Sequence, residues 1–340
     1  RFSGAILQVG GELNGLSLGS VGRGTTIDHV EIVASADDGI ELWGGTVDLK
    51  YCVALFGNDD MFDFDDGWSG RAQFLFGLKT STADTTTSPD ADNGFECDAD
   101  DQKSNNTPRS HPIFYNTTLI GNNKTVFSSD NSGIAAIEAK ELTEGEFYNN
   151  VFSNFRFGLN IIKALGTRTG GSEAYHNWAV TGGNGTQSLK VKCNTFSGVT
   201  YPFRIDKSSS NTPGTFLSSD TAQFYTTDLN VSLAATPGMS SSWAMNASTN
   251  AVTTQVDAIP NPALSTTGCP TPPVDGFFSP APYRGAFAPT GKNWLSDFAL
   301  TTILGQVNGT QACPTDINND GVTNNVDFLQ LLGKFNQSCQ

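Results

Sequence analysis

IDHVEIV at residues 27–33 recurs as LKYCVAL at residues 49–55, an offset of 22 residues that decides the fold. The same offset places DDGIEL at residues 37–42 on DDMFDF at residues 59–64. Each unit thus holds a strand, an acidic turn and a second strand, and ends in a glycine corner. Self-similarity at a fixed period of this length is typical of solenoids, in which every repeat packs on its neighbours.

The second strand of this unit recurs along the chain at irregular spacing. GIEL at residues 39–42 matches segments at residues 94–97, 133–136, 158–161 and 202–205, and a companion strand recurs at residues 114–119, 147–152 and 191–196. Short strands with period-two alternation, Gly and Asn corners and no helical stripe indicate coiled parallel sheets. We therefore predict an all-β, right-handed parallel β-helix of about 22 residues per coil over residues 1–303. An antiparallel β-sandwich is the alternative, but a fixed offset with repeated turn chemistry is hard to obtain there.

The register makes specific packing predictions. Stacked inward side chains are expected at Ile40, Phe62, Phe95, Leu159 and Phe203. Asn side chains at the corners should hydrogen-bond to those of the next coil. Cys52 and Cys97 align with inward positions and are interpreted as small core residues with no assigned partner. The insertions at residues 80–92, 100–111 and 163–188 should be surface loops, and a short helix is expected near residues 294–305.

Two stretches carry a resemblance to a known group of proteins. Residues 14–31 and 38–47 resemble a family of exported β-helix proteins of environmental bacteria, and so do Phe277-Phe278, Tyr283, Gly285-Ala286-Phe287 and Trp294. The resemblance covers roughly residues 5–303 and implies fold and export rather than an activity. Relatives carry further coils before the segment that matches Arg1.

A second module is predicted at residues 304–340. Residues 316–327 match an EF-hand-type loop, in which oxygen ligands at fixed spacings wrap a calcium ion around a glycine bend. The segment resembles a single dockerin repeat, which also ends its loop with Asp and continues into an apolar helix. The expected calcium ligands are Asp316, Asn318, Asp320, the Val322 carbonyl, Asn324 and Asp327. Because dockerins pair two such repeats to bind a cohesin, cohesin recognition is not expected.

Cys313 and Cys339 bracket this module, and we predict a disulfide between them because a small module has little core of its own. The sequence does not assign partners to Cys52, Cys97, Cys193 and Cys269.

Acidic side chains form columns in the repeat register. Glu41, Asp63 and Glu96 share one outward position, and Asp37/Asp59 and Asp38/Asp60 form turn pairs beside it. Carboxylates stacked at the spacing of neighbouring strands, about 4.8 Å, repel one another unless a cation, a hydrogen-bond donor or a raised pKa relieves them. Three interpretations remain open: bound calcium or hydrogen-bonded turn acids, a sugar-binding face with Trp43, Tyr51 and Trp68 as stacking surfaces, and a glycosidase or lyase site. Lys50, Arg71 and Lys79 are loosely placed candidate bases for a lyase.

The composition restricts location and partners. The formal net charge of −15 argues against nucleic acid, which needs clustered cations, and no stretch is long and apolar enough to span a membrane. Richness in Ser, Thr, Asn and Gly suits a secreted or cell-surface bacterial protein. Sequons permit glycosylation at Asn105, Asn116, Asn123, Asn184, Asn230, Asn246, Asn308 and Asn336, although chance predicts nearly as many.

The favoured function is an extracellular structural or interaction protein without enzymatic activity. The alternative is a carbohydrate-binding or carbohydrate-active β-helix protein. A β-helix that begins at Arg1 would leave its first coil uncovered, so a second copy of the chain is an expected partner, giving head-to-tail surface filaments. A glycan is the other expected partner.

Overall fold

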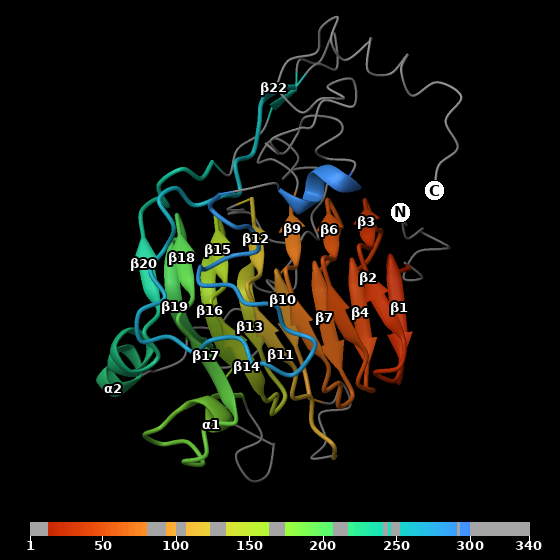
Figure 1. Ribbon diagram of the computed structural model, residues 1–340. Helices are drawn as coiled ribbons and strands as arrows, with labels where there is room; N and C mark the ends of the chain where they lie inside the picture. Colours follow the sequence, from red (N-terminus) through yellow and green to blue (C-terminus); the bar gives the residue numbers. More distant parts are fainter. Residues whose placement is uncertain are drawn as a thin grey trace, which may run out of the picture.

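The computed structural model describes residues 13–79, 93–99, 107–122, 134–162, 174–206, 217–240, 244–245, 252–290 and 293–299. Within these residues the chain winds into a stack of coils, and strands of successive coils pair in parallel (Figure 1). The predicted parallel β-helix is therefore confirmed. The predicted calcium module at residues 304–340, including the Cys313–Cys339 pair, lies outside the described residues, as do residues 1–12, on which the filament hypothesis depends.

Each coil except the last contributes one strand to each of three sheets, and the last coil lacks a strand in the second sheet. The first sheet consists of β1 (Leu16–Gly19), β4 (Ile40–Trp43), β7 (Phe62–Asp65), β10 (Phe95–Cys97), β13 (Ala135–Ala139), β16 (Phe157–Ile162) and β19 (Tyr201–Asp206). The second consists of β2 (Thr26–Asp28), β5 (Asp48–Lys50), β8 (Arg71–Gln73), β11 (Ile113–Tyr115), β14 (Gly145–Tyr148) and β17 (Leu189–Lys192). The third consists of β3 (Glu31–Val33), β6 (Val53–Leu55), β9 (Phe76–Leu78), β12 (Thr118–Ile120), β15 (Val151–Ser153), β18 (Thr195–Ser197) and β20 (Val231–Leu233).

The register of the first sheet confirms the inward column. Ile40 pairs with Phe62, Phe62 with Phe95, and Leu159 with Phe203, because alternate residues of each strand point into the coil. The prediction for residues 133–136 was wrong by three residues. Phe95 pairs with Ile137, so the matching segment begins at Ala136, and the glycine that guided the alignment stands too early in the chain.

The turn between the second and third sheets repeats an unusual backbone conformation. The central residue of this turn has a positive φ in coil after coil, including His29 (54°), Tyr51 (53°), Asn149 (57°) and Cys193 (59°). Next to this position runs the predicted Asn ladder, in which Asn150 Nδ2 donates to Asn194 Oδ1 at 2.9 Å and Asn194 Nδ2 donates to Asn230 Oδ1 at 3.3 Å. All three amides are buried, so each coil satisfies polar groups of the next.

Short helices cover the far end of the stack. Helix α1 (Ala174–Trp178) lies within the predicted 163–188 loop, yet Trp178 is fully buried and stacks on Phe203, so this part of the surface-loop prediction was wrong. After β19, α2 (Ser218–Ala222) and the π-helix η2 (Gln223–Thr227) replace a second-sheet strand, and Phe224 packs on Phe203. Both segments bury apolar side chains against the last coils.

After β20 the described chain forms no further coil, although the prediction extended the β-helix to residue 303. A short antiparallel pair, β21 (Ala244–Met245) with β22 (Val252–Thr254), precedes a long return segment. We name residues 264–290 and 293–299 the strap, because they run back over the outside of the coils (Figure 1). The strap ends in a 3₁₀ turn, η3 (Trp294–Asp297), where the sequence predicted a longer helix.

The strap is held by polar contacts to the ends of second-sheet strands and to the turn that follows them. Lys50 Nζ donates to the Phe277 carbonyl at 2.6 Å, and Gln73 exchanges two hydrogen bonds with the backbone of Ser279. Asn116 Nδ2 donates to the Tyr283 carbonyl at 2.7 Å. These contacts join residues up to 227 positions apart, and the repeat pattern of the sequence does not predict them.

Candidate cation site on the first sheet

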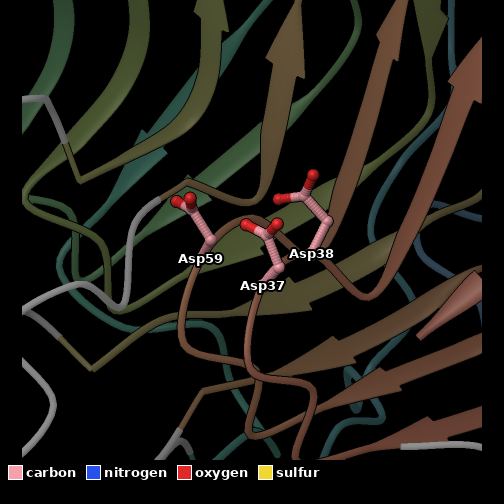
Figure 2. Close-up of side chains that lie close together, drawn as sticks. All are labelled: Asp37, Asp38 and Asp59. Atoms are coloured by element: carbon pink, nitrogen blue, oxygen red, sulfur yellow. The ribbon is translucent and has the colours of Figure 1, made fainter. Parts of the chain in front are cut away.

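The candidate site lies where the chain passes from the third sheet into the first. The turn before β4 carries Asp37 and Asp38, and the equivalent turn before β7 carries Asp59 and Asp60. Figure 2 shows Asp37, Asp38 and Asp59 with their carboxylates gathered on the same side of these two turns. The fixed coil register therefore places acids that are 22 residues apart in sequence beside one another.

One acid of each turn belongs to a backbone-capping ladder. Asp60 N donates to Asp38 Oδ1 at 3.0 Å, Asn93 N donates to Asp60 Oδ1, and Asp38 N donates to Asn14 Oδ1 at 3.1 Å. Asn therefore occupies this position in two coils and Asp in two. Since an amide oxygen accepts the same bond as a carboxylate, the charge on Asp38 and Asp60 is not required for the ladder.

A second group forms around the outward residues of β4 and β7. One carboxylate oxygen each from Asp38, Glu41 and Asp63 lies within 4.8 Å of the other two, and the same holds for Asp37, Asp38 and Asp59. Glu41 and Asp63 face outward as predicted, yet each is only 8% exposed. Among the described residues, Asp63 Oδ1 has no hydrogen-bond partner. Burying an ionised carboxylate oxygen without a partner is unfavourable, and a proton or a cation relieves this cost.

Burial and like charge raise the proton affinity of this group. Burial, with the charges of neighbouring acids, raises the pKa of Asp38 and of Asp63 well above the ordinary range. Burial is also the largest cause that raises the pKa of Glu41, to about 7, while the hydrogen bond from Asn14 partly opposes it. The three carboxylates therefore cannot all be ionised at neutral pH unless positive charge is supplied.

Calcium fits the geometry of this group. Calcium binds carboxylate oxygens at about 2.3–2.6 Å, so two ligands on opposite sides of the ion are up to about 5 Å apart. The oxygens of Asp38, Glu41 and Asp63, within 4.8 Å of one another, fit around one such ion. The hard oxygen donor set also matches calcium rather than a transition metal.

The other acids of the first sheet have partners of their own. Glu96, predicted in the same column, receives Lys140 Nζ at 2.5 Å, and Lys140 also lies 3.3 Å from Asp98. Burial is the largest single effect and lowers the pKa of Lys140, but the charges of the neighbouring acids together raise it well above its ordinary value. Sequence reasoning missed Asp98, Glu138 and Lys140, and Glu138 would have appeared in the column had residues 133–136 been aligned correctly.

The candidate bases and aromatic platforms are only partly on this face. Lys50 and Arg71 lie on the second sheet, where Arg71 pairs with Asp48 at 2.5 Å, so they are not at the acidic group. Lys79 is close to the acidic group, because its Nζ donates to the Asp59 carbonyl. Trp43 is 38% exposed and shares the outer face of β4 with Glu41, whereas Trp68 is completely buried, so its predicted role in stacking was wrong.

The described sequons differ in accessibility. Asn116 and Asn230 are buried and hydrogen-bonded, so the fold leaves no room for a glycan on either amide and these two predictions were wrong. Asn184 is exposed. The remaining five predicted sequons lie outside the described residues: Asn105, Asn123, Asn246, Asn308 and Asn336.

The cysteines whose pairing was open are now resolved. A disulfide joins Cys193 to Cys269, whereas Cys52 and Cys97 are free, buried core residues.

The predicted calcium ligands lie outside the described residues: Asp316, Asn318, Asp320, Val322, Asn324 and Asp327. None of the helices in the described part of the chain has the length and apolar character of a bilayer-spanning segment.

Comparison with known proteins identifies the family. No curated protein matches the chain, and no solved structure matches it either. The family model described as a pectate-lyase-like β-helix domain matches residues 1–247, which include every coil of the three sheets. The chain therefore belongs to the family of pectate-lyase-like β-helix domains.

Proposed function

We propose that this chain is an extracellular carbohydrate-binding protein that holds a divalent cation, calcium, on its first sheet and binds an acidic polysaccharide through it, without cleaving the polymer. The observation that carries the proposal is the convergence of Asp38, Glu41 and Asp63, with one buried oxygen of Asp63 unpartnered. A cation bound there keeps open coordination positions, because three protein oxygens are fewer than the six to eight that calcium takes. Carboxylate and hydroxyl oxygens of a glycan are suitable further ligands.

Two further features support a glycan as the partner. The indole of Trp43 is partly exposed on the same face, and aromatic rings provide apolar stacking surfaces for sugars. The family membership is that of pectate-lyase-like domains, which also favours carbohydrate. The Cys193–Cys269 disulfide supports an oxidising, extracellular location.

The absence of cleavage is proposed from the state of Lys140, a cation bound to Glu96 of the same acidic column. A lyase needs a base that is unprotonated at working pH, near the bound cation. Lys140 has a raised pKa and is held between Glu96 and Asp98, so it stays protonated and occupied. This arrangement suits a charge-balancing role better than proton abstraction.

Calorimetry of calcium binding, followed by binding of polygalacturonate with and without chelator, tests the proposal. We expect calcium-dependent retention of the polymer by the wild type and loss of at least tenfold in affinity in Asp63→Asn. Asp28→Asn, which removes an exposed acid on the second sheet, is the matched control and should bind normally. Equal binding by Asp63→Asn and wild type contradicts the site, and release of unsaturated or reducing sugars contradicts the non-catalytic reading.

A further inference from the structure

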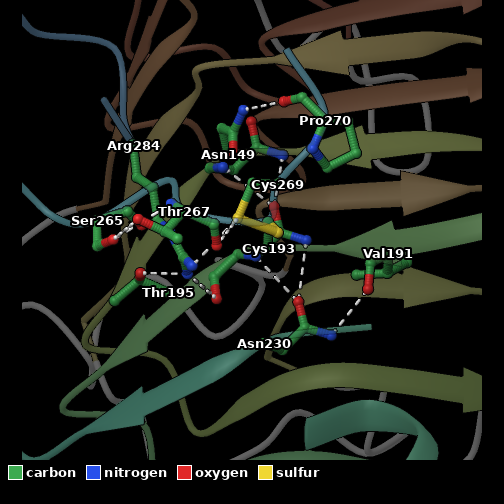
Figure 3. Close-up of a disulfide and its surroundings, with 12 residues drawn as sticks. Asn149, Val191, Cys193, Thr195, Asn230, Ser265, Thr267, Cys269, Pro270 and Arg284 are labelled. Atoms are coloured by element: carbon green, nitrogen blue, oxygen red, sulfur yellow. Dashed lines mark hydrogen bonds between the residues drawn. A yellow bond between two sulfur atoms is a disulfide. The ribbon is translucent and has the colours of Figure 1, made fainter. Parts of the chain in front are cut away.

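The strap carries one covalent connection to the β-helix. Cys193 occupies the positive-φ turn between β17 and β18 and is completely buried, while Cys269 lies on the strap and is partly exposed. Their disulfide joins residues 76 positions apart (Figure 3). The two ends of the disulfide therefore differ, because Cys269 is a partly exposed residue on the strap and Cys193 belongs to the core.

Arg284 lies against this disulfide, and none of its partners among the described residues is an anion. The side chain is only 6% exposed, and it donates to the Ser265 carbonyl at 2.8 Å, the Asn194 carbonyl at 3.0 Å and Thr195 Oγ1 at 3.2 Å. Its Nη2 atom lies 3.6 Å from Cys269 Sγ (Figure 3).

The acceptors that the described residues offer to Arg284 are all neutral. Burial alone lowers the pKa of Arg284, to about 10, and no carboxylate in the described part of the chain opposes this effect. Burying a guanidinium without a counter-ion is unfavourable. The sulfur of Cys269, 3.6 Å from Arg284 Nη2, can become an anion once the cysteine pair has been reduced.

We propose that Cys269 is a thiol-exchange site at which Arg284 holds the sulfur as a thiolate once a small-molecule thiol has opened the disulfide. A nearby guanidinium favours the thiolate over the thiol, and a stabilised thiolate is a good leaving group in exchange reactions. The site goes beyond the proposed glycan binding and is independent of it, because it lies on the strap rather than on the first sheet.

The exchange proceeds in two balanced steps. A small thiol gives up its proton and its sulfur attacks that of Cys269, the partly exposed cysteine of the pair; the Cys193–Cys269 bond breaks, and the departing Cys193 sulfur takes up one proton. A second thiolate attacks the small-molecule sulfur of the mixed disulfide, and Cys269 leaves as a thiolate beside Arg284. The cysteine pair gains two electrons, and two small thiols become one small disulfide. Hydrogen bonds from Arg284 and Asn149 to strap and coil backbone remain available to hold the strap in place.

The two free cysteines of the described residues have a different environment from that of Cys269. Cys52 and Cys97 are completely buried, and burial raises the pKa of both thiols, that of Cys52 to about 12. Neither is therefore expected to exchange in the folded protein, which makes the two residues internal negative controls.

A redox titration of the full-length protein against reduced and oxidised dithiothreitol tests the proposal. The fraction of Cys269 in the disulfide is read by alkylation and peptide mass spectrometry. In Arg284→Gln we expect the equilibrium constant for reduction to fall about tenfold, and Arg284→Lys, which keeps the charge, should restore much of it. If Arg284 merely anchors the strap, Arg284→Gln loosens the strap and makes reduction easier, which is the opposite sign. An unchanged or increased constant therefore overturns the proposal.

A second measurement covers the case in which Arg284→Gln fails to fold. In Cys193→Ser, alkylation of Cys269 by iodoacetamide is followed as a function of pH, with Cys52 and Cys97 as unreactive references. We expect half-maximal reactivity at least one pH unit below about 8.5, the ordinary value for a free thiol. Half-maximal reactivity at or above that value contradicts a thiolate held by Arg284.

Discussion

The acidic group of the first sheet predicts an unusual dependence of stability on pH. The perturbation is a rise from pH 5 to pH 8 in calcium-free buffer. A carboxyl group with a raised pKa binds its proton more tightly in the folded than in the unfolded chain, so it favours the folded state at low pH. As the pH rises from the ordinary value of 4.5 through about 7, the folded-state pKa of Glu41, this contribution is lost.

The magnitude follows from the size of the shift. Each unit of pKa difference corresponds to about 1.4 kcal/mol, and the change from 4.5 to about 7 in Glu41 gives about 3 kcal/mol. Since the carboxyls of Asp38, Glu41 and Asp63 titrate as a coupled set, we take about 2 kcal/mol as the expected loss in the free energy of unfolding. Calcium should reverse the loss, because at 100 times its dissociation constant a ligand stabilises the folded state by about 2.7 kcal/mol.

Urea denaturation at pH 5 and pH 8, with chelator or with calcium, measures these quantities. Calcium should stabilise the wild type more at pH 8 than at pH 5, because protons compete for the same oxygens. Asp63→Asn should reduce both the pH dependence and the calcium response, and Asp28→Asn should change neither. The reasoning is refuted if stability without calcium rises from pH 5 to pH 8, or if Asp63→Asn responds to calcium as the wild type does.

Three further predictions concern the ladder, a charge network and the tail. Asn194→Ala should lower the free energy of unfolding by about 4 kcal/mol in urea denaturation, because it removes four hydrogen bonds between the Asn194 side chain and buried groups, at about 1 kcal/mol each. A loss below about 1 kcal/mol contradicts the ladder. Hydrogen bonds from His111 to Glu144 and Glu146 raise the pKa of His111 to about 9, so the charged imidazole stabilises the folded state at low pH. After allowance for solvent screening, His111→Gln should lower the free energy of unfolding by about 1 kcal/mol below pH 6.5, and the difference from the wild type should vanish above pH 9. A difference that does not depend on pH excludes the ion pairs. Chelation should increase hydrogen exchange at residues 313–339, and exchange unchanged by chelator excludes the predicted calcium loop.

The neighbour contacts of the β-helix could be predicted from the sequence because a solenoid encodes them locally. Each strand alternates inward and outward residues, and a coil packs only on the next coil, so a 22-residue offset is enough to align Ile40 with Phe62 and Glu41 with Asp63. The same logic predicted the acidic columns. It failed at residues 133–136, where a glycine displaced by three positions misled the alignment.

The sequence by itself thus determined the repeat, the inward column and the acidic positions, whereas the tertiary structure decided which acids are buried, which is unpartnered and what covers the coils. Burial of Asp63 and the open Asp63 Oδ1 atom depend on neighbours from other coils, not on residues beside it in sequence. The strap pairs with the coils through single hydrogen bonds, such as that of Lys50 with Phe277, and through the Cys193–Cys269 disulfide. These contacts do not recur with the 22-residue repeat, and several donors or cysteines in the sequence could have formed them. Only the folded chain therefore shows which residues pair.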